Sequence, residues 1–175
     1  MADRIFIGFG GNLAGPAGSP RQSIAAAARL LGLRGIHLVA QSALYESEPW
    51  GGIRQPRFVN GVWEARSRRS PQQVLGILLD VEKQLGRRRR VRWGARVIDL
   101  DLLAYGYVSG QWQAPVALQL PHPAIAQRAF VLRPFADLAA GFQPGGPGAP
   151  NIGQMAAGLP VFARAATRRI VATQG

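Results

Sequence analysis

Residues 98–102 constrain the fold more than any other stretch of this chain. Apolar residues there alternate with Asp99 and Asp101, which is the period-2 pattern of a strand with one buried face. Both carboxylates should therefore project to the same side of the strand, about 7 Å apart. Arginines or divalent cations can neutralise such a pair, and Mg²⁺ is favoured because it binds carboxylates together with substrate phosphates. A strand whose outward acids simply pair with arginines would give the same pattern.

A run of arginines directly precedes this strand. Residues 87–96 contain six arginines: Arg87, Arg88, Arg89, Arg90, Arg92 and Arg96. Guanidinium groups beside a metal-binding acid pair are what the binding of a polyphosphate requires. The alternative interpretation is a solvated charge run at the negative end of a helix dipole.

Composition limits the class of protein. The 175 residues carry a formal net charge of +12, which indicates an anionic partner such as a nucleotide, a nucleic acid or an anionic membrane. The absence of cysteine excludes a disulfide framework and a thiolate metal site. The sequence has no signal peptide and no stretch of roughly 18 apolar residues. We therefore expect one cytoplasmic domain over residues 1–175, with a basic C-terminal tail over about 160–175.

The order of predicted elements indicates an α+β fold. Serine followed by proline predicts helix starts at Ser19 and Ser70, and Gln73 completes a capping box at the second. We predict strands over 4–9, 36–45, 58–66 and 99–105, and helices over 20–31 and 71–85. This β-α-β-β-α-β order is that of a ferredoxin-like antiparallel sheet with helices. Further on we expect a polar turn over 106–113, a short C-terminal strand over 116–120, a short helical segment reaching Phe130, a loop over 141–150 and a small helix over 152–157.

Four blocks of motifs, in order over about residues 4–140, carry a family resemblance. They are Gly8-Phe9-Gly10-Gly11-Asn12-Leu13; Ser42-x-x-Tyr45-Glu46-Ser47-x-Pro49-x-Gly51 with Gln55-x-x-Phe58-Val59-Asn60; Glu82-x-x-Leu85-Gly86-Arg87 with Arg92-Trp93-Gly94-x-Arg96-x-x-Asp99-Leu100-Asp101; and Leu120-Pro121-His122-Pro123 with Arg128-x-Phe130. Together they resemble the 6-hydroxymethyl-7,8-dihydropterin pyrophosphokinase family of folate biosynthesis.

The resemblance implies transfer of a pyrophosphoryl group from ATP to a pterin hydroxymethyl oxygen, with two Mg²⁺ ions held by Asp99 and Asp101. It implies a pterin site, with the ring stacked between two phenylalanines, made of Ser47, Pro49, Trp50, Phe58, Asn60, Trp93 and Phe130. It implies catalytic contacts from Arg87, Arg89, Arg96 and His122. It implies nucleotide contacts from Glu82, Arg92, Arg96, His122 and Arg128. Ala95 stands where this family usually has proline, which should loosen the hinge of a closing loop.

Two other functions fit parts of the sequence. The charge of +12 and the predicted scaffold would suit a basic RNA-binding module. However, the strand over residues 58–66 lacks the aromatic and basic motif of such modules, and Asp99 with Asp101 would repel a phosphate backbone unless metals were present. A catalytically silent relative is disfavoured because the acids and arginines are all present. We therefore expect a monomeric enzyme that acts on ATP and a pterin, with no nucleic-acid or membrane partner.

Overall fold

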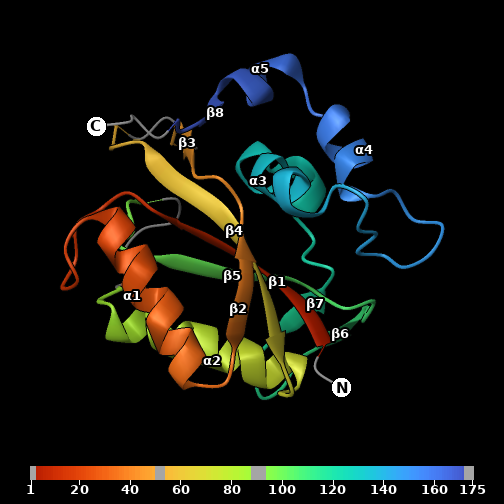
Figure 1. Ribbon diagram of the computed structural model, residues 1–175, viewed down its shortest axis with the longest axis horizontal. Helices are drawn as coiled ribbons and strands as arrows, with labels where there is room; N and C mark the ends of the chain where they lie inside the picture. Colours follow the sequence, from red (N-terminus) through yellow and green to blue (C-terminus); the bar gives the residue numbers. More distant parts are fainter. Residues whose placement is uncertain (1–2, 50–53, 88–93, 172–175) are drawn as a thin grey trace.

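The computed structural model describes residues 3–49, 54–87 and 94–171 and shows an antiparallel sheet covered by helices (Figure 1). The strands of the main sheet run in the order β5, β1, β4, β3, β8, and β2 also pairs with β4. This order and the antiparallel pairing confirm the predicted ferredoxin-like core. The elements are β1 Asp3–Gly11, α1 Pro20–Leu33, β2 His37–Gln41, β3 Tyr45–Ser47, β4 Phe58–Ser67, α2 Pro71–Gln84, β5 Asp99–Tyr105, β6 Gly110–Trp112, β7 Leu118–Leu120, the 3₁₀ turn η1 Ile125–Gln127, α3 Ala129–Ala139, α4 Ile152–Ala157, α5 Val161–Ala165 and β8 Thr167–Arg169.

Helices α1 and α2 cover one face of the sheet. Both begin at the predicted serine caps, Ser19 and Ser70, with proline in the first turn. The capping box predicted at Ser70 is present, and α1 has one as well, closed by Gln22. Their apolar faces pack against the odd-numbered side chains of β1, such as Ile5 and Ile7, in the larger hydrophobic core. Val74, on the face predicted for the second helix, is fully buried there.

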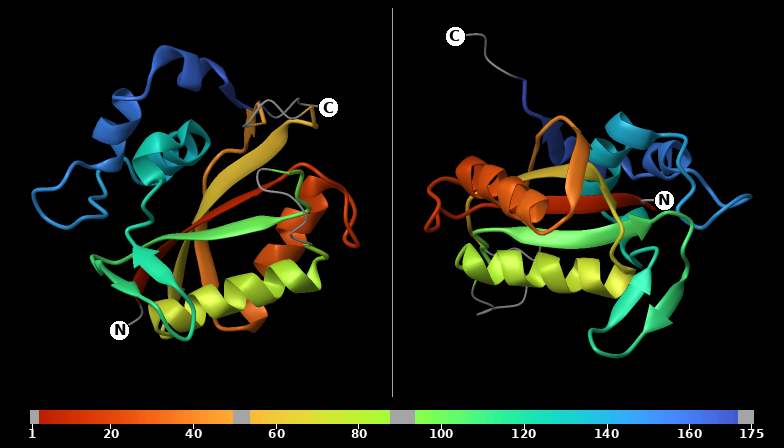
Figure 2. Two further views of the ribbon diagram at one scale, coloured as in Figure 1. Left: turned by 180° about the vertical axis from the view of Figure 1, so that it is seen from behind. Right: turned by 60° about the horizontal axis from the view of Figure 1, so that its bottom comes forward.

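Helices α3 and α4 cover the other face. Leu132 and Phe135 of α3 pack against Phe6 of β1, Val62 of β4 and Leu103 of β5 in a second core cluster. Figure 2 shows α3, α4 and α5 gathered on one side of the molecule, away from α1 and α2. The side chains of β5 alternate between the two faces, so Asp99 and Asp101 lie on the same face as Leu103.

Four segments differ from the sequence-based expectation. The strand expected over 36–45 is divided into β2 and β3, because the Ser42 hydroxyl between them accepts a hydrogen bond from the Val62 N–H (3.0 Å). The expected turn over 106–113 contains β6, which pairs with β7. The short segment expected before Phe130 leads into the 11-residue helix α3, which tolerates Pro134 in its interior. Residues in the basic tail form α5 and β8.

Within the described ranges, no helix has both the length and the apolar character needed to cross a bilayer.

Candidate active site

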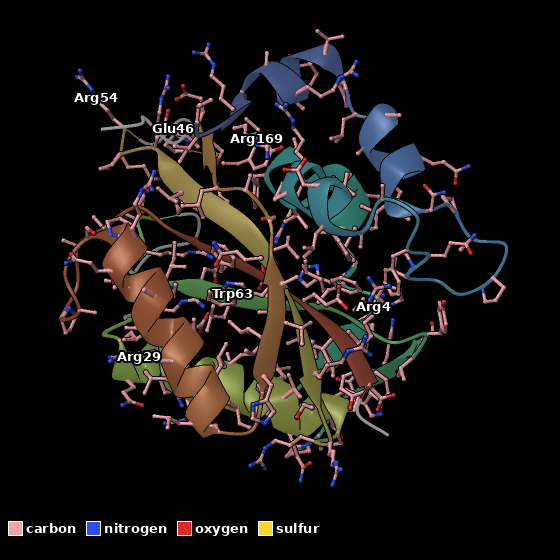
Figure 3. All side chains as sticks on the ribbon, viewed as in Figure 1. Arg4, Arg29, Glu46, Arg54, Trp63 and Arg169 are labelled. Atoms are coloured by element: carbon pink, nitrogen blue, oxygen red, sulfur yellow. The ribbon has the colours of Figure 1, made fainter. Side chains whose placement is uncertain are left out.

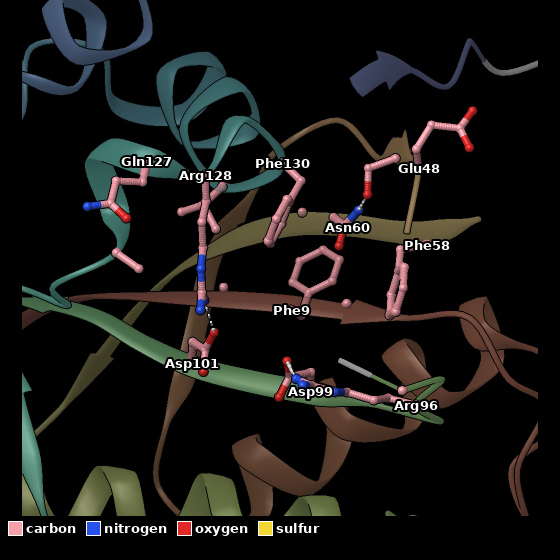
Figure 4. Close-up of a pocket in the computed structure, with 17 residues that line it drawn as sticks. Phe9, Glu48, Phe58, Asn60, Arg96, Asp99, Asp101, Gln127, Arg128 and Phe130 are labelled. Atoms are coloured by element: carbon pink, nitrogen blue, oxygen red, sulfur yellow. Dashed lines mark hydrogen bonds and ion pairs between the residues drawn. The ribbon is translucent and has the colours of Figure 1, made fainter. Parts of the chain in front are cut away.

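A cavity opens between the sheet and the start of α3. Its floor is formed by parts of β1, β4 and β5, and its walls by β3 and by residues 124–131 (Figure 4). Of the residues predicted for the site, those in the described ranges that line this cavity are Ser47, Phe58, Asn60, Arg96, Asp99, Asp101, Arg128 and Phe130. They come from separate stretches of the chain, and the fold brings them into one hollow.

The two aspartates lie side by side on β5, and each has arginine partners. Asp99 pairs through one oxygen with Arg87 (2.7 Å) and through the other with Arg96. Asp101 pairs with Arg128 at 3.2 Å. Burial raises the pKa of Asp101, and the negative charge of Asp99 raises it further. The ionised form of Asp101 is therefore disfavoured by burial and by repulsion from Asp99, and a further cation would stabilise it.

Arg87 does not line the cavity and is held beside Asp99 by a buried carboxylate. Glu82 is only 2% exposed, and its Oε1 accepts the Leu100 N–H (2.6 Å) and also pairs with Arg87. Burial raises the pKa of Glu82 to about 7. Glu82 does not line the cavity. Its placement therefore differs from the predicted nucleotide contact and makes it a support for Arg87 and for the start of β5.

Two aromatic rings flank an amide on the far side of the cavity. Phe58 and Phe130 are both partly exposed, and Figure 4 shows Asn60 between them. The Asn60 Nδ2 donates to the Ser47 hydroxyl (2.9 Å), and both side chains are buried. Phe58 lies outside both core clusters, whereas Phe130 is partly buried and also packs against the second cluster. This part of the cavity suits a flat heterocycle with a polar edge.

A second hollow adjoins the first at Asp101. It is lined on its other sides by His122 and by apolar groups such as Leu75, Trp112 and Leu118. The His122 Nδ1 accepts the Ala124 N–H (3.1 Å), and burial lowers the pKa of this histidine. A neutral imidazole that shares a hollow with an aspartate can donate through its remaining ring nitrogen.

Comparisons with known proteins decide the family. The family described as 7,8-dihydro-6-hydroxymethylpterin-pyrophosphokinase matches residues 6–140. The chain belongs to this family. Among its relatives is the 2-amino-4-hydroxy-6-hydroxymethyldihydropteridine pyrophosphokinase of Pseudomonas aeruginosa, with 42% identity over 79% of this chain and 82% of the relative. The enzyme of the same name from Methylorubrum extorquens is 39% identical over 78% of this chain and 82% of the relative.

Solved structures of the pyrophosphokinase family share the fold. The wild-type HPPK-DHPS of Plasmodium falciparum superposes with a TM-score of 0.67 at 12% identity, over 90% of this chain. The HPPK-DHPS solved in complex with substrates gives a TM-score of 0.68 at 12% identity, over 96% of this chain. This chain spans only 44% and 46% of those two longer proteins, so the likeness concerns the architecture of one part of each.

Some residues predicted from the family motifs lie elsewhere or cannot be placed. Pro49 is partly exposed and does not line the cavity. Trp50, Arg89, Arg92 and Trp93 lie outside the described residues. No group of three or more histidine, cysteine or acidic side chains suited to a metal gathers anywhere in residues 3–49, 54–87 and 94–171. A metal at this site would thus depend on the aspartate pair and on oxygens of the substrate.

The site also contains a residue to which sequence reasoning gave no role. Asn12, in the first family motif, is buried; its Oδ1 accepts the Arg96 N–H (2.8 Å), and its Nδ2 donates to the Pro56 carbonyl (2.8 Å) and to Gln55 (3.2 Å). It therefore ties together two segments that border the cavity. The only signal for Asn12 in the sequence was its place after two glycines. The second of them, Gly11, is needed because the chain passes close to the strand start there: a Cβ at Gly11 would lie 2.4 Å from the Val97 carbonyl oxygen.

Proposed function

We propose that this protein transfers the pyrophosphoryl group of ATP to 6-hydroxymethyl-7,8-dihydropterin in folate biosynthesis. The hydroxymethyl oxygen forms a bond to the β-phosphorus of ATP and loses its proton. The bond from that phosphorus to the oxygen bridging the α-phosphate breaks, and this oxygen leaves with AMP. The products are AMP and the pterin diphosphate. The names of the relatives and the family motifs support this reaction.

One observation carries the proposal to specific residues. The aspartate pair with its arginines and the aromatic slot with Asn60 lie in the same cavity. A pyrophosphoryl transfer needs its acceptor and its polyphosphate held close together, because the reaction depends on positioning and charge neutralisation more than on covalent help from the protein. This shared cavity supports a site for a flat ring beside a site for phosphates.

The acceptor side is proposed to hold the pterin. The rings of Phe58 and Phe130 offer stacking surfaces for a heterocycle, and Asn60 can both donate to and accept from its polar edge. Ser47 orients the Asn60 amide, since the Asn60 Nδ2 donates to the Ser47 hydroxyl and leaves Oδ1 for the ligand. The roles of Pro49, Trp50 and Trp93 at this side remain predictions from the family motifs.

The donor side is proposed to hold ATP. Its phosphates would lie over the acid pair, within reach of Arg96 and Arg128, and Arg87 would support them through its ion pair with Asp99. The hollow that contains His122 shares Asp101 with the main cavity and offers apolar surface for a nucleotide base. Arg89 and Arg92, predicted to contact phosphates, complete this set as expectations.

The residues present fit Mg²⁺. Asp99 and Asp101 supply hard carboxylate oxygens on one face, and burial and mutual repulsion leave Asp101 in need of positive charge. We propose that this pair holds two ions together with phosphate oxygens. When bound, the ions would neutralise developing negative charge on the triphosphate. We further propose that the enzyme acts in the cytoplasm as a monomer.

The test is AMP production from ATP with Mg²⁺, in the presence and absence of 6-hydroxymethyl-7,8-dihydropterin. We expect AMP only when the pterin is present, and we expect it to disappear when a chelator is added. The matched control for substitution of Asp99 or Asp101 by asparagine is Asp80→Asn, which removes an exposed acid of α2 and should leave the rate of AMP formation unchanged. A folded protein that forms no AMP under these conditions would overturn the proposal and would make salt-dependent RNA binding the next measurement.

A further inference from the structure

The C-terminal part of the chain lies beyond the family match at residues 6–140, yet it contacts the acceptor wall of the cavity. Strand β8 pairs with β3, with Thr167 opposite Ser47 and Arg168 opposite Glu46. Thr167 is 2% exposed. Figure 1 shows β8 beside β3 at the edge of the sheet, and Figure 3 places Glu46 and Arg169 at this same edge.

Hydrogen bonds extend the pairing past both ends of the strand. The Ile170 N–H donates to the Leu44 carbonyl (2.8 Å), and the Glu48 N–H donates to the Ala166 carbonyl (3.2 Å). Strand β3 is only three residues long, so β4 on its inner side offers it few bonds. The second ladder therefore fixes the backbone that presents Ser47 and Glu48 to the cavity.

Arg133 of α3 holds this segment from the other side. Its Nη1 donates to the carbonyl oxygens of Arg164 (2.8 Å) and Thr167, and its guanidinium lies 5.3 Å from the centre of the Tyr45 ring. The Tyr45 hydroxyl in turn donates to Asp137 (2.9 Å), one turn further along α3. Strand β3, strand β8 and helix α3 are thus joined through two side chains of the helix.

The same helix carries the aromatic wall. Phe130 lies three residues before Arg133, so the two side chains project from neighbouring positions on one face of α3. A change in how α3 meets β3 would therefore alter the separation of Phe130 from Ser47 and Asn60. Ser47 on β3 and Phe130 on α3 are therefore both held in place by contacts with the C-terminal segment.

We propose that Arg133 and residues 164–170 form a positioning clamp for the acceptor side of the cavity, an inference that rests on the proposed pterin pyrophosphokinase function. The clamp sets the separation of Phe130 from Ser47 and from the Asn60 amide that Ser47 orients. It does not touch the aspartate pair or the second hollow. Loosening the clamp should therefore weaken binding of the pterin and leave binding of ATP unaffected.

The first test compares two substitutions at one position of the full-length chain. Arg168 lies midway between the two hydrogen bonds at Ala166 and Ile170, so strand alternation directs its N–H to the Glu46 carbonyl. Arg168→Pro removes this donor, whereas Arg168→Ala removes only an exposed charge. We expect Arg168→Pro to raise the KM for the pterin about 3- to 10-fold, with the KM for ATP and kcat unchanged. Arg168→Ala should match the wild type.

The second test addresses the clamp from the helix. Arg133→Ala should raise the KM for the pterin to a similar extent, and Arg133→Lys should recover part of the loss because it keeps a cationic donor. Arg164→Ala is the matched control, since Arg133 contacts the main-chain oxygen of this residue and the substitution leaves that oxygen in place. Pterin fluorescence, with an α,β-methylene analogue of ATP present, measures the binding directly.

The outcomes separate this inference from the proposed function. Wild-type protein that forms no AMP would refute the function itself. If the wild type is active, an unchanged pterin KM in both Arg168→Pro and Arg133→Ala would refute the clamp. A parallel rise in the KM for ATP, or a loss of kcat alone, would also refute it, because either result indicates a disturbance that is not confined to the acceptor wall.

Discussion

The two aspartates of β5 should respond differently to the same substitution. Asp101 has one partner, Arg128 at 3.2 Å, and a repulsive neighbour in Asp99. Because the side chains of this pair are still 35% and 33% exposed, solvent screening limits its contribution to about 0.5 kcal/mol, and relief of the repulsion offsets that loss. Asp101→Asn should therefore change the free energy of unfolding by less than about 1 kcal/mol. Asp99 pairs with Arg87, whose side chain is only 12% exposed, so Asp99→Asn should cost about 1–3 kcal/mol.

Both variants should lose activity despite this difference in stability. A carboxylate that holds a catalytic cation contributes several kcal/mol to the transition state, and a loss of about 3 kcal/mol lowers the rate about 100-fold. Initial rates of AMP formation and thermal unfolding followed by circular dichroism provide the two readouts. Near-normal AMP formation by either variant would refute the metal assignment. Equal destabilisation by the two substitutions would refute the ion-pair reasoning.

Three further predictions follow from groups around the cavity. Burial raises the pKa of Glu82 from 4.5 to about 7, so its proton contributes stability below about pH 4.5 that is lost as the pH rises to about 7. Urea unfolding at pH 5 and pH 8 measures this change in the free energy of unfolding. Between these pH values the wild type should lose up to about 3 kcal/mol more than Glu82→Gln does. An equal loss in the two proteins would exclude the shift. Asn60→Ala should raise the KM for the pterin about 10-fold or more, and pterin titration of the variant checks this. Gly10→Ala places a Cβ 2.6 Å from the Asn60 Oδ1 and should raise the same KM, whereas Gly32→Ala, which meets nothing within 4 Å, should not.

Local chemistry explains what the sequence predicted well. The starts of α1 and α2 depend on neighbouring residues, serine at the cap and proline in the first turn, so they are readable without tertiary contacts. The same holds for β5, where two acids alternate with apolar residues over one short run. Their position on one face then followed from the geometry of a strand.

Contacts between distant parts of the chain explain what the sequence could not give. Glu82 lies one residue from the apolar face of α2, and the N–H that its buried carboxylate accepts belongs to Leu100, 18 residues away. The partners of Asn12 lie between 43 and 84 residues away. Strand β8 is three residues long and mostly polar, so no hydrophobic period marks it.

The net charge of the chain also has a kinetic consequence. Arg87, Arg96 and Arg128 are balanced by Asp99, Asp101 and Glu82, so a ligand that approaches the cavity meets the field of the whole chain, whose net charge is +12. Such a field attracts an anionic nucleotide over several ångströms and accelerates its encounter with the protein. Added salt screens that attraction. The association rate of the nucleotide should therefore fall with ionic strength more steeply than that of the uncharged pterin.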